Sequence, residues 1–105
     1  MSLASLFGFT GNARIEPRAA WKKVEEGAVL LDVRSPEEFA TGAAPGAINI
    51  PVQTLGQRMT ELKKSQEVVV YCRSGGRSAT AARMLQANGF DVVDAGGLST
   101  LMSGR

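Results

Sequence analysis

The sequence contains no histidine and only one cysteine, Cys72, among its 105 residues. The missing histidine excludes a Cys–His dyad of the protease or acyltransferase type, in which an imidazole activates the thiol. It also leaves no Cys/His combination from which the usual zinc sites are built. A lone cysteine cannot form an intrachain disulfide, so any chemistry at sulfur must use Cys72. Neither a metal nor a cofactor is expected.

Long runs of one charge and long apolar segments are also missing. Lys and Arg exceed Asp and Glu by a net charge of only +2, and the few aromatic residues are scattered. This composition is unlike the basic grooves with stacking aromatics that bind single-stranded nucleic acids. The apolar stretch at residues 3–9 is too short to span a bilayer, and no Lys or Arg precedes Arg14 as in a secretory signal. We therefore expect a cytoplasmic protein that binds neither nucleic acid nor membrane.

Length and composition are those of one folded unit. Hydrophobic residues make up 44% of the chain and charged residues 21%, which is close to ordinary globular usage. A chain of 105 residues can build a single hydrophobic core without disulfide or metal support. We predict one domain over residues 1–105, with residues 1–13 as a mobile N-terminal tail.

Apolar runs of strand length alternate with helical patterns along the chain. Strands are predicted over residues 29–33, 47–50, 67–71 and 90–93, the second of them short and at an edge. Helices are predicted over residues 15–27, 35–42, 54–64 and 78–88, with a last helical turn at 98–102 and a loop at 94–97. This order predicts an α/β fold in which helices cover both faces of a central, mostly parallel sheet.

The segment Cys72-Arg73-Ser74-Gly75-Gly76-Arg77-Ser78 joins a predicted strand to a predicted helix. Its two glycines allow the backbone to curl with N–H groups inward, and the helix adds unpaired N–H groups and the positive end of its dipole. The result is an anion cradle around a sulfur atom. Since the thiolate is the nucleophile and a free thiol has a pKa of about 8.5, such a cradle would activate Cys72.

Several residues near this loop are open to more than one interpretation. A lone cysteine after an apolar strand is most often an inert buried thiol, which the glycines and arginines of the loop disfavour here. Arg73 is the candidate for attracting an anionic substrate. Arg77 could contact a ligand or form a structural ion pair with Asp32. Asp32 and Arg34 lie at the carboxyl end of a strand, the edge where parallel sheets bind ligands.

Three motifs of the chain are similar to those of the rhodanese family, specifically its single-domain members. They are residues 31–39 (LDVRSPEEF), residues 45–51 (PGAINIP) and the loop at residues 72–78, followed by Gly96 and Gly97. The resemblance implies a rhodanese-like α/β fold around a parallel sheet. Where the family commonly has Gly-His-Ile, this chain has Gly42-Ala43-Ala44, so a hydrogen-bonding side chain is missing from that turn. The C-terminal helix is expected to be short or absent.

The resemblance also implies the activity of a thiosulfate sulfurtransferase. Cys72 would accept a sulfane sulfur from thiosulfate or a persulfide donor and, as a persulfide, pass it to cyanide, a small thiol or a protein thiol. The backbone N–H groups of the loop would bind the terminal sulfur, which makes the following residues the predicted substrate-binding set: Arg73, Ser74, Gly75, Gly76, Arg77 and Ser78. Asp32 and Arg34 match a family motif beside the site and are interpreted as its structural support.

Two other functions stay open at this point. Cysteine phosphatases and arsenate reductases also use a Cys…Arg loop before a helix, but with one residue more than the four that separate Cys72 from Arg77. The shorter loop makes a tighter cradle, which suits a sulfur atom better than a tetrahedral phosphate. The sequence does not separate a free enzyme from a partner-dependent sulfur carrier or a regulatory rhodanese module.

Overall fold

A computed structural model of the chain describes residues 14–105, so the tail predicted over residues 1–13 lies outside the described residues. Four parallel strands form its central sheet in the order β2-β1-β3-β4. They are β1 (Val29–Asp32), β2 (Ile48–Asn49), β3 (Val68–Cys72) and β4 (Val92–Gly97). The parallel sheet and the short edge strand β2 confirm the predicted fold class.

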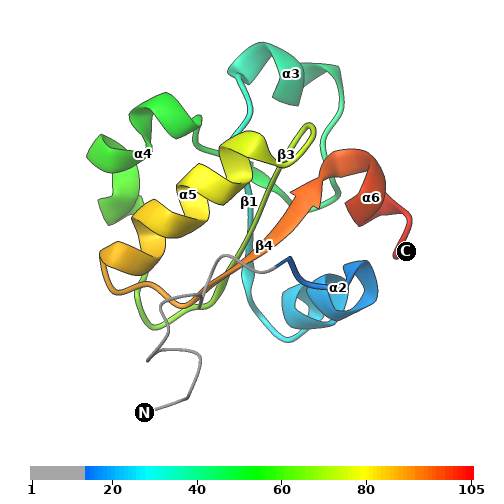
Figure 1. Cartoon of the computed structure of the whole chain (residues 1–105), viewed down its shortest axis with the longest axis horizontal. Coiled ribbons are helices and arrows are strands. Elements are labelled where there is room, and N and C mark those ends of the chain that lie inside the picture. The colour runs from blue at the N-terminus through cyan, green and yellow to red at the C-terminus, as the bar shows by residue number, and fades with distance from the viewer. Residues whose placement is uncertain (1–13) are drawn as a thin grey trace.

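Helices cover both faces of this sheet (Figure 1). The helical elements are α2 (Pro17–Glu25), α3 (Pro36–Thr41), α4 (Val52–Arg58), the 3₁₀ turn η1 (Met59–Glu61), α5 (Gly76–Ala87) and α6 (Leu98–Met102). α4 and α5 pack on one face, and α2 and α6 pack on the other. Within residues 14–105, no helix has the length and apolar character needed to cross a membrane. The cytoplasmic location stays a prediction.

The central strand β3 decides which face each of its side chains reaches. All five of its residues are buried. Because successive side chains of a strand alternate, Val68, Val70 and Cys72 enter the core beneath α4 and α5. Val69 and Tyr71 enter the core beneath α2 and α6. Cys72 and Tyr71 are therefore adjacent in sequence, but their side chains lie on opposite faces of the sheet.

The start of α3 follows the sequence pattern closely. Ser35 Oγ accepts a hydrogen bond from the Glu38 N–H at 3.1 Å, and the Ser35 N–H donates to Glu38 Oε1 at 3.1 Å. Pro36 occupies the first helical position, where a missing N–H costs nothing. The predicted capping box is thus present, and it fixes the Glu38 side chain close to the carboxyl edge of the sheet.

The predicted helix over residues 54–64 is wrong at both ends. α4 begins at Val52, because the Thr54 N–H and hydroxyl both donate to the Pro51 carbonyl and close a first turn there. The helix tightens into η1 after Arg58, a 3₁₀ geometry in which side chains three residues apart align. This alignment lets Met59 and Leu62 both enter the core. Lys63 and Lys64, which the predicted helix included, consequently follow the helical segment.

The loop predicted at residues 94–97 is instead the end of β4. The strand continues to Gly97, with a register irregularity opposite Val70 and Tyr71. Asp94 Oδ1 accepts a hydrogen bond from the Gly96 N–H at 2.8 Å and stabilises the irregular segment. The two glycines resemble turn residues in the sequence, but the strand itself needs them, because Gly96 has φ of 78° and the Arg73 backbone occupies the space where a Cβ of residue 97 would lie.

Candidate active site at the carboxyl edge of the sheet

The sulfur of Cys72 accepts hydrogen bonds from the loop that follows β3. The Gly75 N–H donates to Sγ at 3.0 Å. Gly75 has φ of 110°, a left-handed conformation that suits glycine, and it is the residue from which α5 begins. The Gly75 amide therefore faces inward, as the sequence predicted for the amides of this loop. Cys72 itself is 1% exposed, while Arg73 and Ser74 above it are exposed.

Opposing effects act on the pKa of the Cys72 thiol. Burial raises it, whereas hydrogen bonds from the Ser78 hydroxyl and from the N–H groups of Ser78, Gly75 and Ser74 lower it. The hydrogen bonds outweigh burial, so the pKa lies below its ordinary value. The cradle thus favours the thiolate, which is the reactive form of cysteine.

The Ser78 hydroxyl is a hydrogen-bond donor that can reach either the Cys72 sulfur or a backbone carbonyl. Ser78 is fully buried, and its Oγ lies 3.1 Å from the Gly75 carbonyl oxygen. A hydroxyl has one proton to donate, so it can serve either that carbonyl or the sulfur. A charged sulfur is the stronger acceptor of the two. Ionisation of Cys72 therefore gains a side-chain hydrogen bond in addition to the backbone amides.

Arg77 forms its ion pair with Glu38 and not with Asp32, which corrects the sequence-based pairing. Arg77 Nη1 lies 2.6 Å from Glu38 Oε1, and Nη2 lies 3.0 Å from Oε2. Asp32 is unavailable because it points to the opposite face of the sheet, where Arg34 binds it. Hydrogen bonds from the Arg77 guanidinium first, and from Ser35 second, lower the pKa of Glu38 to about 2. Arg77 thus ties the start of α5 to α3.

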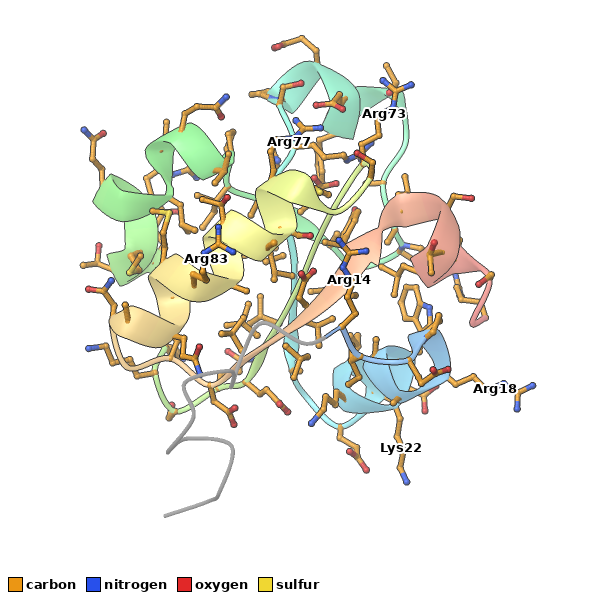
Figure 2. The ribbon with its side chains drawn as sticks, in the orientation of Figure 1. Arg14, Arg18, Lys22, Arg73, Arg77 and Arg83 are labelled. Carbon is orange, nitrogen blue, oxygen red and sulfur yellow. The ribbon has the colours of Figure 1, made fainter. Side chains whose placement is uncertain are left out.

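Arg73 is the arginine of the loop that faces solvent. It is exposed, and no ion pair among residues 14–105 involves it. Figure 2 shows Arg73 at the end of the loop, close to α3 and α6. It borders an open pocket of about 460 Å³ whose other lining residues are Arg34, Glu38, Thr41, Leu98 and Ser99. An anion in this pocket would meet an uncompensated positive charge beside the loop.

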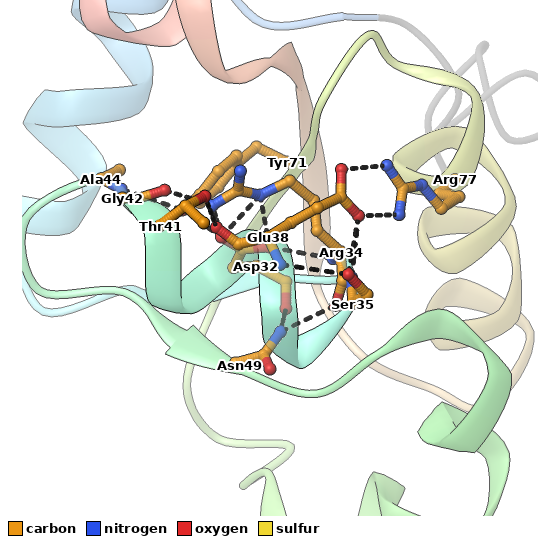
Figure 3. A network of polar contacts seen from close by, with 10 residues as sticks. All are labelled: Asp32, Arg34, Ser35, Glu38, Thr41, Gly42, Ala44, Asn49, Tyr71 and Arg77. Carbon is orange, nitrogen blue, oxygen red and sulfur yellow. Dashed lines mark hydrogen bonds and ion pairs between the residues drawn. The ribbon is translucent and has the colours of Figure 1, made fainter.

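Asp32 and Arg34 form a buried polar network on the other face of the sheet (Figure 3). Asp32 is fully buried, and Arg34 is 5% exposed. Arg34 Nη2 donates to Asp32 Oδ2 at 2.7 Å, and the Tyr71 hydroxyl donates to the same oxygen at 2.5 Å. Burial raises the pKa of Tyr71, so its hydroxyl stays protonated as a donor. The network gives the buried carboxylate the charged partner and hydrogen bonds that burial requires.

The same network fixes the turn before β2. The Arg34 guanidinium donates to the Gly42 carbonyl at 2.7 Å, and the Ala44 N–H donates to the Tyr71 hydroxyl at 3.0 Å. Asn49 Nδ2 donates to the carbonyl oxygens of Asp32 and Arg34 at 3.0 and 2.9 Å. The buried Arg34 and Tyr71 side chains thus give the backbone of this turn two hydrogen bonds.

Most of the chain matches a known protein family. The model of the Rhodanese-like domain matches residues 16–99, which include every strand, the loop after β3 and the Asp32–Arg34 network. The chain belongs to the rhodanese-like domain family. The family resemblance inferred from the three sequence motifs is therefore confirmed.

Relatives of this rhodanese-like domain include a sulfurtransferase of Allochromatium vinosum, which is 42% identical over 65% of this chain and 64% of its own length. YrkF of Bacillus subtilis, provisionally named as a sulfur carrier protein, is 38% identical over 66% of this chain and 37% of its own length. The chain thus spans less than two thirds of the length of each of these two relatives. The structure of reduced Bacillus anthracis CoADR-RHD matches with a TM-score of 0.81 and 32% identity, covering 96% of this chain and 18% of that one.

Two glycines at the end of β4 contribute to the site of this rhodanese-like domain in a way that the sequence pattern did not indicate. Gly97 pairs with Cys72 in the sheet. A Cβ at Gly97 would lie 2.6 Å from the Arg73 carbonyl oxygen, and a Cβ at Gly96 would lie 3.0 Å from Arg14 Cδ. The doublet lets β4 pass directly beneath the cysteine loop. The sequence signal was the doublet itself, which resembles a turn when its distant neighbours are unknown.

The Arg77–Glu38 pair predicts a dependence of stability on pH in the acid range. The folded-state pKa of Glu38, about 2, lies below the usual 4.5, so the pair stabilises the fold above pH 4.5 and loses this contribution as the pH falls toward 2. Glu38→Gln should therefore cost about 1 kcal/mol at pH 6, given a partly exposed pair, and almost nothing at pH 2. Urea unfolding across this pH range measures the difference, with exposed Glu37→Gln as the matched control. An equal cost of Glu38→Gln at both pH values would contradict the assignment.

Proposed function

We propose that this rhodanese-like domain is a sulfurtransferase that carries the transferred sulfur as a persulfide on Cys72. The observation that supports this most strongly is the set of N–H groups directed at the Cys72 sulfur, with Gly75 at 3.0 Å. Such donors stabilise the thiolate before the reaction and the negative charge that develops on the added sulfur during it. Preorganised backbone donors act in this way in oxyanion holes, and they are most effective where water is excluded.

The proposed reaction has two balanced steps. The Cys72 thiolate attacks the outer sulfur of thiosulfate, a Cys72 S–S bond forms, and the S–S bond of thiosulfate breaks. Sulfite leaves with the bonding electron pair, and the terminal sulfur of the persulfide keeps one negative charge. Cyanide or a thiolate then attacks that terminal sulfur, so that thiocyanate or a new persulfide is released and the Cys72 thiolate returns. No metal, external oxidant or cofactor enters either step.

Arg73 is the proposed binding group for an anionic donor. Its guanidinium is exposed, borders the pocket beside the loop and has no ion-pair partner among residues 14–105. Arg77 and the Asp32–Arg34 pair are assigned to support, because their charges are already matched by Glu38 and by each other. The loop residues Ser74, Gly75, Gly76 and Ser78 are proposed to bind the transferred sulfur through backbone N–H groups and the Ser78 hydroxyl.

A partner-dependent sulfur carrier is the second candidate, and two observations favour it. Cys72 is 1% exposed, so a donor must reach a sulfur that lies below the surface. YrkF, one of the relatives, is provisionally named as a sulfur carrier protein. A cysteine phosphatase is disfavoured, because the Arg77 guanidinium that would bind phosphate is engaged by both oxygens of Glu38.

Steady-state assays with small substrates distinguish these functions. The sulfurtransferase should form thiocyanate from thiosulfate and cyanide with saturation in both substrates, and it should release no phosphate from an aryl phosphomonoester. A carrier should take up sulfur from thiosulfate but turn over only when a partner protein is added. Phosphate release without thiocyanate formation would contradict the proposal and favour the phosphatase.

A further inference from the structure

Arg14 belongs to none of the sequence motifs, yet its backbone is fixed beside the end of β4. It forms an isolated parallel bridge with Asp94, and the next residue, Ile15, donates its N–H to the Asp94 carbonyl at 2.9 Å. Figure 2 shows the Arg14 side chain over β4, between α5 and α6. Arg14, the first described residue, thus lies beside both the end of β4 and the start of α5.

The Arg14 guanidinium occupies the space next to Gly75. A Cβ at Gly75 would overlap Arg14 Nη2 and lie 2.6 Å from Cζ, while a Cβ at Gly96 would lie 3.1 Å from Nη1. The guanidinium is therefore in contact with the backbone of Gly75, the residue whose N–H donates to the Cys72 sulfur. Glycine at position 75 is favoured by its φ of 110°, and a larger residue there would also displace the Arg14 guanidinium.

Asp94 holds the guanidinium in this place. The Asp94 side chain is 1% exposed, and Arg14 Nε lies 3.6 Å from its Oδ2. Oδ1 accepts the Gly96 N–H at 2.8 Å, whereas Oδ2 has no hydrogen-bond donor among residues 14–105. A buried carboxylate needs a charged or polar partner, and the charge nearest to Oδ2 is that of Arg14. Asp94 thus orients a guanidinium that covers Gly75 from outside.

We propose that Arg14 is a positioning residue that holds the Gly75 N–H against the Cys72 sulfur. Glycine has a wide range of allowed backbone conformations. Gly75 is also followed by a second glycine, Gly76, which is exposed. Without the guanidinium, the Gly75 peptide is free to move away from the sulfur toward the space that Arg14 fills. This positioning role rests on the proposed role of Cys72. Because it concerns the hydrogen bond to the thiolate, the reactivity of the thiol can test it without any sulfur transfer.

Alkylation of Cys72 by iodoacetamide as a function of pH tests the proposal. The variants are Arg14→Ala, which removes the guanidinium, and Arg14→Lys, which keeps a charge for Asp94 but lacks the planar group over Gly75. Arg18→Ala is the matched control, because Arg18 is an exposed arginine on the neighbouring helix α2. Thermal unfolding of each variant and hydrogen exchange of the Gly75 amide are measured alongside.

Both Arg14 variants are expected to slow alkylation at neutral pH by about 5- to 10-fold, as expected when a thiol pKa rises by up to one unit. Both should speed exchange of the Gly75 amide, and Arg14→Lys should keep the thermal stability of the wild type. Wild-type alkylation in Arg14→Lys would overturn the positioning role and leave only a charge effect. If Arg14→Ala does not fold, Arg14→Lys decides alone. Failure of the wild type to form a persulfide would end the proposed function but would not alter these alkylation profiles.

Discussion

Replacing Cys72 by serine is expected to abolish thiocyanate formation from thiosulfate and cyanide, with a loss of at least about 10³-fold. A serine hydroxyl is almost entirely protonated at neutral pH and cannot form the persulfide, so the covalent route is removed and not merely slowed. No other residue can take over, because Cys72 is the only cysteine and the chain has no histidine. Initial rates at saturating thiosulfate measure the effect.

The fold should be nearly unaffected by Cys72→Ser, which separates chemistry from stability. The sulfur contributes one atom to a core cluster that contains larger side chains from six elements, namely β1, α4, η1, β3, α5 and β4, and serine differs from cysteine by that atom. Arg73→Ala is the useful comparison, since it should weaken the use of anionic donors while thiocyanate formation remains measurable. Full activity in Cys72→Ser, with a circular dichroism spectrum like that of the wild type, would contradict the account.

Replacing Arg34 by alanine is expected to destabilise the fold by about 3–5 kcal/mol, the usual cost of removing one partner from a buried ion pair. Asp32 would keep the Tyr71 hydroxyl but lose the Arg34 guanidinium, which is its charged partner. The Gly42 carbonyl would lose its donor as well. Urea unfolding gives the free-energy difference.

Arg58→Ala is the matched control for this substitution. Arg58 pairs with Glu61 at 2.8 Å, but their side chains are 40% and 52% exposed, and such surface pairs contribute little to stability. The double variant Asp32→Asn with Arg34→Ala should recover part of the loss, since it removes the uncompensated charge. An Arg34→Ala cost no larger than that of Arg58→Ala would show that the buried network does not stabilise the domain.

The parts of the fold that were predictable from the sequence depend on neighbouring residues. The apolar run that forms β3, the Ser35–Glu38 capping box and the inward amides of the loop are all encoded within a few positions. Each reflects a strong local preference that the tertiary structure does not oppose. Sequence reasoning therefore located the loop around Cys72, whose role as the nucleophile stays a prediction.

The features that the sequence did not predict depend on distant residues. Arg77 pairs with Glu38 because α3 and α5 meet at one edge, whereas Asp32 is turned to the other face. Positions 96 and 97 of β4 suit glycine because residue 96 has φ of 78° and the Arg73 carbonyl lies where a Cβ of residue 97 would be. Neither fact follows from spacing along the chain, since glycine doublets are also typical of turns.

The proposed function requires that Cys72 hold a transferred sulfur within the loop amides. Intact-mass measurement after incubation with thiosulfate and removal of the small molecules tests this most directly, followed by mapping of the modified peptide. The wild type is expected to gain one sulfur atom on Cys72 and to lose it when cyanide is added. Cys72→Ser is expected to gain no sulfur atom. An unchanged wild-type mass, or an added sulfur that persists in Cys72→Ser, would contradict the proposed function.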